Sequence, residues 1–219
     1  MNQLKDEDIV YLASCEGIRF IKKLDISSNL ITCEGAGYLA QSTIFKNLRK
    51  LNLSSNKIKD SGLTQLARSP NFPSLQCLDV SVNKIEENGV KALAESEELC
   101  SLEVLKLRMN PFGEKGAKFL SESPALSNIQ HINLQGCGIG DAGCKVLVCS
   151  KLLGVQLRKL YLDENKLTQE GAQAIAESCF ISELSVLSLS WNTLKDEGVL
   201  HLAMSQYLTK LTHLILRDN

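Results

Sequence analysis

The sequence predicts an α/β solenoid. Its right-handed coils stack so that a parallel β-sheet lines the concave face of a horseshoe arc and helices cover the convex face. Three observations predict this fold. An Asn or Cys recurs every 27 or 28 residues, an alternating apolar pattern precedes each of them, and an apolar pattern with helical spacing follows. Eight repeats of 27–28 residues therefore account for the chain.

One position anchors the repeat. Asn occupies it at 29, 56, 83, 110, 165, 192 and 219 and Cys at 137, and each spacing is 27 residues except the 28 between Cys137 and Asn165. The segments that end there read IKKLDISSN, LRKLNLSSN, LQCLDVSVN, LEVLKLRMN, IQHINLQGC, LRKLYLDEN, LSVLSLSWN and LTHLILRDN. All of them fit L-x-x-L-x-L-x-x-(N/C), and so many matches in register exclude coincidence.

The first half of each repeat predicts a strand, because alternate side chains of a strand point to opposite faces of a sheet. We expect Leu51 and Leu53 to face the core of the second coil, and Lys50 and Asn52 to face outward. The Asn follows where the chain turns away, and its amide both donates and accepts hydrogen bonds. Stacked coils should thus form an Asn ladder that satisfies buried backbone groups, with Cys137 filling one rung as a weak S–H donor.

The second half of each repeat predicts a short helix. An apolar residue lies two positions after the Asn or Cys, Gly lies six after and Leu or Ile lies ten after. The Gly lets the neighbouring coil approach closely. A Ser recurs thirteen positions after the anchor, and we expect its hydroxyl to bond a carbonyl in the last helical turn. Candidates to cap the helix N-termini are Thr32, Asp60, Asp141, Thr168 and Asp196.

The repeats run through residues 1–219, which predicts a single domain. Helices are wider than the strand spacing of about 4.8 Å, so we expect the array to bend with its helices outside. Asn2 and Asn219 both occupy the anchor position of the repeat, so the sequence starts and stops at the same point of a repeat unit. Neither end shows a polar cap. We therefore expect the chain to be a segment of a longer array, or its ends to be covered by another chain.

Composition narrows the possible partners and the compartment. The 24 basic and 25 acidic residues leave a net charge of −1, which argues against binding to nucleic acid or to an anionic membrane. The N-terminus lacks the pattern of a signal peptide, and no run approaches the roughly 18 apolar residues of a spanning helix. We therefore expect a cytoplasmic protein whose eight cysteines are reduced and structural.

The strand motif, the helical half with its Gly and Leu-Ala, and the unit length together resemble the ribonuclease-inhibitor-like class of leucine-rich repeats over essentially the whole chain. The turn Gly136-Cys137-Gly138-Ile139 is similar to the Cys variant of that class. Strict alternation of two repeat types is missing, so the resemblance does not imply ribonuclease binding. It implies a non-enzymatic scaffold for protein–protein interaction, with no cofactor and no small-molecule substrate. The uniform unit looks most like free-standing bacterial or protist arrays, and an effector of an intracellular bacterium or a sensor domain is one expectation.

Outward strand residues change character along the chain. Those of the first three coils are mostly small or polar, and those from the fourth coil onward are larger and more varied. A solvated face with random variation is one interpretation. The other is a binding face, because Trp and Tyr are enriched at binding hot spots. We predict that a protein partner binds the C-terminal half of the concave face, centred near Tyr161 and Trp191 and contacted by Lys106, Arg108, Met109, His131, Lys159, Asp163, Glu164, His213 and Arg217.

Two alternatives of other classes stay open. One is a GTPase-activating protein of the Ran-activator type, for which Arg108, Lys106 and Arg217 are available, and the other is a structural spacer. No catalytic residues are predicted, because His131 and His213 fall three coils apart and no nucleophile or phosphate-loop motif is present. No metal site is predicted either, because Cys144 aligns with core alanines and Cys149 with outer polar residues.

Overall fold

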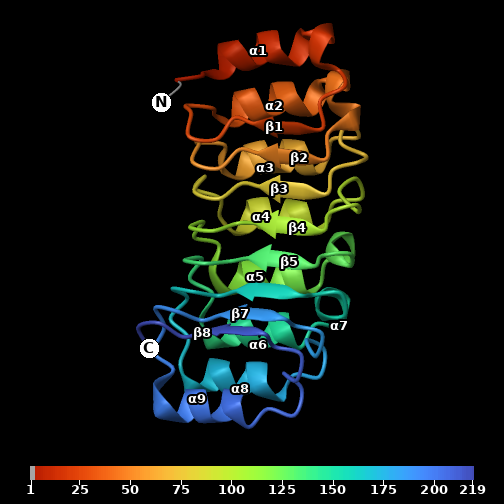
Figure 1. Cartoon of the computed structure of the whole chain (residues 1–219). Coiled ribbons are helices and arrows are strands. Elements are labelled where there is room, and N and C mark those ends of the chain that lie inside the picture. The colour runs from red at the N-terminus through yellow and green to blue at the C-terminus, as the bar shows by residue number, and fades with distance from the viewer. Residues whose placement is uncertain (1–2) are drawn as a thin grey trace.

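The computed structural model describes residues 3–219 as a stack of coils, each with a strand followed by a helix (Figure 1). The strands are β1 (Lys23–Asp25), β2 (Lys50–Asn52), β3 (Cys77–Asp79), β4 (Val104–Lys106), β5 (His131–Asn133), β6 (Lys159–Tyr161), β7 (Val186–Ser188) and β8 (His213–Ile215). The α-helices are α1 (Asp6–Ser14), α2 (Cys33–Gln41), α3 (Lys59–Ala67), α4 (Glu87–Ala94), α5 (Gly113–Ser121), α6 (Gly140–Val148), α7 (Lys151–Gly154), α8 (Gln169–Glu177) and α9 (Lys195–Ala203). We number coils 1 to 8 by their strands.

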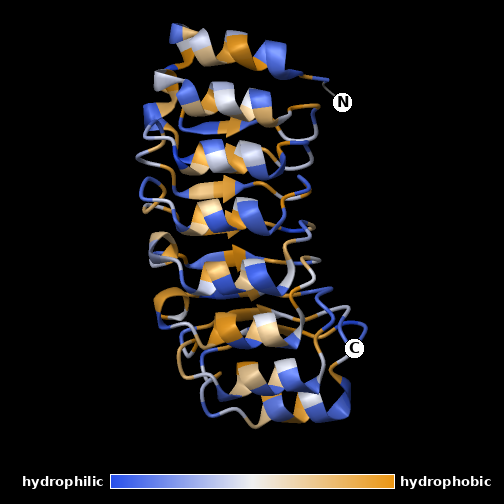
Figure 2. Cartoon of the chain, turned by 180° about the vertical axis from the view of Figure 1, so that it is seen from behind, coloured by the Kyte–Doolittle hydropathy of each residue, from blue (hydrophilic) through white to orange (hydrophobic). Residues whose placement is uncertain are grey.

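The strands form one open parallel sheet in the order β1-β2-β3-β4-β5-β6-β7-β8. Equivalent residues of successive repeats pair, so Leu51 lies between Leu24 and Leu78, and Lys50 pairs with Cys77. Helices cover one face of this sheet, as the view from behind shows (Figure 2). The other face, which we call the strand face, carries no helix (Figure 1). The predicted α/β solenoid with strands and helices in separate layers is therefore confirmed.

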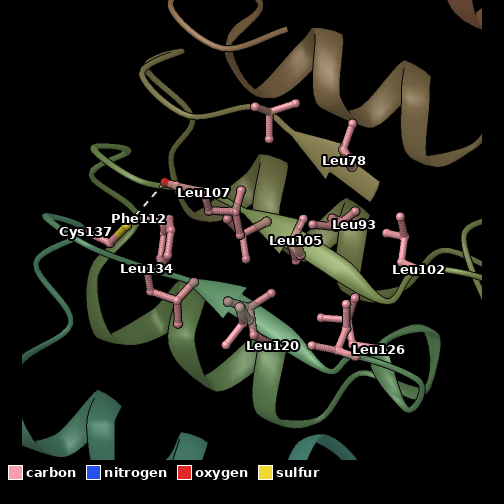
Figure 3. Close-up of a cluster of buried hydrophobic side chains, with 14 of the residues drawn as sticks. Leu78, Leu93, Leu102, Leu105, Leu107, Phe112, Leu120, Leu126, Leu134 and Cys137 are labelled. Atoms are coloured by element: carbon pink, nitrogen blue, oxygen red, sulfur yellow. Dashed lines mark hydrogen bonds between the residues drawn. The ribbon is translucent and has the colours of Figure 1, made fainter. Parts of the chain in front are cut away.

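The core is a continuous apolar layer between the sheet and the helices. Leu51 and Leu53 are 1% and 0% exposed, as the alternation predicts. In coil 4, Leu105 and Leu107 from the strand side meet Leu120 of α5 (Figure 3). Each coil buries one face of its strand and one face of its helix, so its core is completed only by the coils stacked on it.

The predicted Asn ladder is confirmed. Each Asn side chain takes up backbone groups of its own coil and of the coil before it. Asn110, for example, accepts from the Ile85 N–H at 3.0 Å and donates to the Val80 and Leu107 carbonyls at 3.0 and 2.9 Å. Asn165 repeats this arrangement with the Ile139 N–H and the Leu134 carbonyl. These amides satisfy backbone groups in buried turns that water does not reach.

A second ladder runs along the opposite edge, at the C-terminal ends of the helices. Each recurring Ser hydroxyl donates to a carbonyl in the last helical turn, as predicted, but the helix belongs to the preceding coil. Ser96 bonds the Ala67 carbonyl at 2.5 Å, and Ser123 bonds the Ala94 carbonyl at 2.8 Å. The same bond is made by Ser42, Ser69, Ser150, Ser178 and Ser205. The serines therefore link neighbouring coils.

The expected helix caps are confirmed for Thr32 and Thr168, whose hydroxyls accept from the backbone two residues later. The expectation is wrong for Asp60 and Asp141. The Asp141 carboxylate bonds the Thr168 N–H and hydroxyl of the next coil at 2.8 and 2.7 Å, and Asp60 bonds the Glu86 N–H at 2.6 Å. Each carboxylate thus sits at the N-terminus of the following coil's helix, where a negative charge is favourable.

The expectation is also wrong for Asp196, which lies inside the first turn of α9, two residues after the N-cap Leu194. The recurring Gly allows the helices of neighbouring coils to pack closely. A Cβ on Gly143 would lie 3.1 Å from the Ala117 Cβ and 3.2 Å from the Glu114 Cα of the preceding helix.

The 28-residue unit contains α7, where shorter units have either a 3-10 turn or a loop.

Candidate functional site

The residues of the predicted binding face lie in columns, because equivalent strand positions stack. His131 pairs with Lys159, which pairs with Val186, which pairs with His213. The two histidines are thus three strands apart, or about 14 Å at the usual strand spacing, and cannot form one compact site. A neighbouring column runs through Lys106, Asn133, Tyr161, Ser188 and Ile215.

The predicted site residues differ in exposure. Seven are exposed, three are half-buried and one is buried. The exposed ones are Lys106, Arg108, Met109, Glu164, Trp191, His213 and Arg217. The half-buried ones are His131, Lys159 and Tyr161, and the buried one is Asp163. Tyr161 lies in β6, whereas Trp191 lies in the turn after β7, so the two proposed anchors belong to adjacent coils but to different columns.

Asp163 serves the fold. Its carboxylate accepts from the Ser188 hydroxyl at 2.5 Å and from the Ser190 N–H at 2.8 Å. These bonds join coil 6 to coil 7 and leave the group 8% exposed. Sequence alignment placed Asp163 in an outward column, but the carboxylate turns toward the neighbouring coil to satisfy its hydrogen bonds.

The small polar residues of the first coils have a similar role. Asp25 accepts from the Ser27 N–H and hydroxyl at 3.0 and 2.6 Å, and Asn52 accepts from the Ser54 N–H at 3.0 Å. These are Asx turns, in which a side chain two residues earlier replaces a backbone partner. The hydrogen bond from Ser27 lowers the pKa of Asp25. The change from serine-rich to bulky residues along the chain thus reflects turn chemistry as well as surface variation.

Charged groups on the strand face are of both signs. Lys106 pairs with Asp79 at 3.3 Å. Burial and the nearby Lys159 ammonium lower the pKa of His131, so its imidazole is neutral at pH 7. Arg108 and Arg217 are exposed in coils 4 and 8, which places them about 19 Å apart by strand spacing. They are too far apart to act together on one phosphate group.

The residue just before each Asn or Cys forms what we call the turn column. Its members all have positive φ, between 53° and 65°: Ser28, Ser55, Val82, Met109, Gly136, Glu164, Trp191 and Asp218. At this point the chain leaves the sheet. The side chains of the column project from one edge of the strand face, and three large apolar ones are open to solvent, with Val82 and Met109 each 41% and Trp191 62% exposed.

Coil 5 interrupts this column. Gly136 stands in the turn column and Gly138 stands two residues later, where the other coils carry Leu30, Lys57, Lys84, Pro111, Lys166 or Thr193. A cavity of about 570 Å³, which we call the notch, opens over these glycines. Its walls are Met109 and Pro111 on one side and Glu164, Lys166, Trp191 and Thr193 on the other. Sequence reasoning missed the notch, although glycines on both sides of Cys137 were its signal.

Cys137, at the base of the notch, is the one rung of the ladder without an amide. Its thiol donates to the Leu107 carbonyl at 3.3 Å, as predicted, and lies beside the buried Phe112 (Figure 3). Sulfur does not replace the amide oxygen, however, so the Phe112 N–H bonds the Asn110 carbonyl of its own coil at 3.0 Å. Burial raises the pKa of Cys137 to about 12, so this thiol stays protonated.

The other cysteines divide by exposure. Cys144 is buried between helices, as its alignment with alanine predicts, and burial raises its pKa. Cys149 is exposed, as its alignment with outer polar residues predicts, and the expectation of a structural role is wrong for the exposed cysteines, which are Cys15, Cys100, Cys149 and Cys179. These positions lie at helix ends and in loops that no neighbouring coil covers.

A further cavity of about 660 Å³ lies on the helical side, lined by Phe119, Pro124, Cys100 and three glutamates.

Within residues 3–219, no group of three or more His, Cys, Asp or Glu side chains is arranged to hold a metal ion. No helix in that range has the length and apolar character needed to cross a membrane.

A repeated strand-turn-helix coil with an Asn ladder and a single parallel sheet defines a solenoid repeat protein. A family profile described as "Leucine Rich repeat" matches seven segments, which together cover more than half of the chain: residues 17–40, 46–67, 73–94, 98–121, 125–148, 157–176 and 183–203. The chain belongs to the leucine-rich-repeat family. Domains of this family typically bind proteins and act as non-enzymatic scaffolds. The profile does not distinguish the ribonuclease-inhibitor-like class from others, and no curated protein matches the chain.

Proposed function

We propose that this protein is a non-enzymatic scaffold that holds a protein partner against the C-terminal half of the strand face and the adjoining turn column. The observation that carries the proposal is the exposure of Trp191, which at 62% is the most exposed apolar side chain of the turn column, with Met109 exposed in the same column. Large exposed apolar side chains with polar surroundings are typical of protein interfaces. Tyr161, half-buried in the adjacent coil, extends this surface toward the middle of the sheet.

The shape of the surface supports the same conclusion. Eight short strands present a continuous face on which side chains of both charge signs alternate with polar ones. A mixed-sign surface favours a specific protein patch, because a uniform polyanion or an anionic membrane requires one sign of charge. Asp163 is excluded from the contact set, because its carboxylate is already bonded within the fold.

The experiment is affinity capture from a cell extract with the wild-type chain and with Trp191→Ala, Tyr161→Ala and Val82→Ala. Val82 is the matched control, because it is 41% exposed, lies in the same turn column as Trp191 and belongs to coil 3. Loss of an aromatic anchor should weaken capture by about 30-fold, equivalent to about 2 kcal/mol.

Circular dichroism should show the same fold for all variants, since each side chain projects from the sheet. If Trp191→Ala and Tyr161→Ala recover the same partner as Val82→Ala in equal amounts, the binding surface lies elsewhere, and the helical-side cavity around Phe119 becomes the next surface to test.

A further inference from the structure

The notch lies at coil 5, where two glycines replace residues that have side chains in other coils. Coils 1–4, 6 and 7 carry a side chain in the turn column and in the position two residues later, while coil 5 has Gly136 and Gly138 in these two places. Nothing lies within 4 Å of the point where a Gly138 Cβ would be. At about 570 Å³ the notch falls within the size range of ligand pockets.

Two groups lean into the notch from opposite coils. The Met109 thioether occupies the place where a Gly136 Cβ would be, and the Glu164 Oε2 lies 3.7 Å from that point. The exposed indole of Trp191 lines the same cavity from the coil beyond Glu164. An apolar thioether, an aromatic ring and a carboxylate therefore surround a space whose floor has no side chains.

The notch carries one acidic and one basic side chain, Glu164 and Lys166. Within residues 3–219, neither Glu164 nor Lys166 has an opposite charge within 4 Å. A group with a cationic end can pair with Glu164 in the notch. A hydrogen-bond acceptor on the same group can bond Lys166, which lines the cavity two residues further along the turn.

From this arrangement we infer that the notch receives an arginine side chain from a loop of the partner, and this inference rests on the function proposed above. A guanidinium is planar and weakly hydrated, stacks on aromatic rings and pairs with carboxylates. Its flat shape suits a glycine floor between Met109 and Trp191. The backbone carbonyls of the arginine-bearing loop supply the acceptor for Lys166. An ammonium lacks the planar stacking surface, so lysine fits the same place less well.

The chain contains a single tryptophan, so the fluorescence of Trp191 reports on the notch directly. The probes are three blocked tripeptides with Gly on either side of Arg, citrulline or Lys, titrated into the full chain. Citrulline has nearly the shape of arginine without its charge. We expect saturable binding of the Arg peptide, with the citrulline and Lys peptides each about fivefold weaker, since an exposed ion pair contributes up to about 1 kcal/mol.

Two variants test the assignment on the protein side. Glu164→Gln should weaken the Arg peptide about fivefold and abolish its advantage over citrulline. The matched control is Glu170→Gln, another exposed glutamate that does not line the notch, and it should leave binding unchanged. Gly138→Asn fills the notch with a side chain that tolerates the local φ of +70°, and should prevent binding while the fold is retained.

The absence of a saturable change, equal affinity for the Arg and citrulline peptides, or insensitivity to Glu164→Gln would each overturn the inference. These results differ from a failure of the proposed function. If Trp191→Ala abolishes partner capture and no peptide binds, the scaffold role stands and the arginine assignment falls.

Discussion

The Asn ladder makes a quantitative prediction at the boundary between coils 3 and 4. Asn110 is 0% exposed, and its side chain makes four hydrogen bonds to backbone groups. It accepts from the Asn83 and Ile85 N–H groups, both at 3.0 Å, and donates to the Val80 and Leu107 carbonyls. At a net value of about 1 kcal/mol for each bond, Asn110→Ala should lower the free energy of unfolding by about 4 kcal/mol.

Cys137 provides the matched comparison, because it occupies the same rung without the amide oxygen. Its one S–H donates to the Leu107 carbonyl at 3.3 Å, with the Gln135 carbonyl at 3.5 Å, and the Phe112 N–H already has another acceptor. Cys137→Ala should therefore lower the free energy of unfolding by only about 1 kcal/mol. Asn110→Cys keeps the donor and removes the acceptor for two buried N–H groups, so about 2 kcal/mol is expected.

The assay is urea unfolding followed by circular dichroism and by Trp191 fluorescence. The two probes should agree if coils unfold together, because Trp191 lies three coils from Asn110. Equal destabilisation by Asn110→Ala and Cys137→Ala would refute the reasoning, since it would mean that the acceptor oxygen contributes nothing. A loss below about 1 kcal/mol for Asn110→Ala would refute it as well.

Three further predictions follow from the same contacts. Ser96→Ala removes the bond to the Ala67 carbonyl and should lower the free energy of unfolding by about 1–2 kcal/mol, whereas the exposed Ser101→Ala should change it by less than about 0.5 kcal/mol in the same urea assay. A thiol reagent should modify the exposed cysteines of the folded chain quickly and reach two others only after unfolding, because Cys137 and Cys144 are buried and protonated; fast reaction of all eight would contradict this. The pKa of Asp25 is lowered in the folded state, so its contribution to stability is present above its unfolded pKa near 3.8 and is lost as the pH falls through the lower folded value. The stability difference between wild type and Asp25→Asn should therefore shrink on acidification through this range, and a difference that grows would contradict the assignment.

The repeat pattern determined most of the architecture by itself. Spacing of the Asn and Cys residues predicts which positions stack, and the alternation around Leu51 and Leu53 predicts which side chains enter the core. Both predictions hold because each coil is nearly a translated copy of the last, so one repeat defines the environment of all. The same logic predicted that Cys144 is buried and that His131 and His213 are separated.

The tertiary structure alone decided which coil each polar side chain serves. Asp141 and Ser96 bond groups 27 and 29 residues away, because neighbouring coils lie closer than the two ends of one coil's own helix. The notch is a second case. Gly136 and Gly138 are ordinary turn residues when read along the chain, and they form a cavity only because Met109, Glu164 and Trp191 stand beside them in the stack. Sequence spacing assigns a residue to a column, but hydrogen bonds and empty space depend on what the adjacent columns place against it.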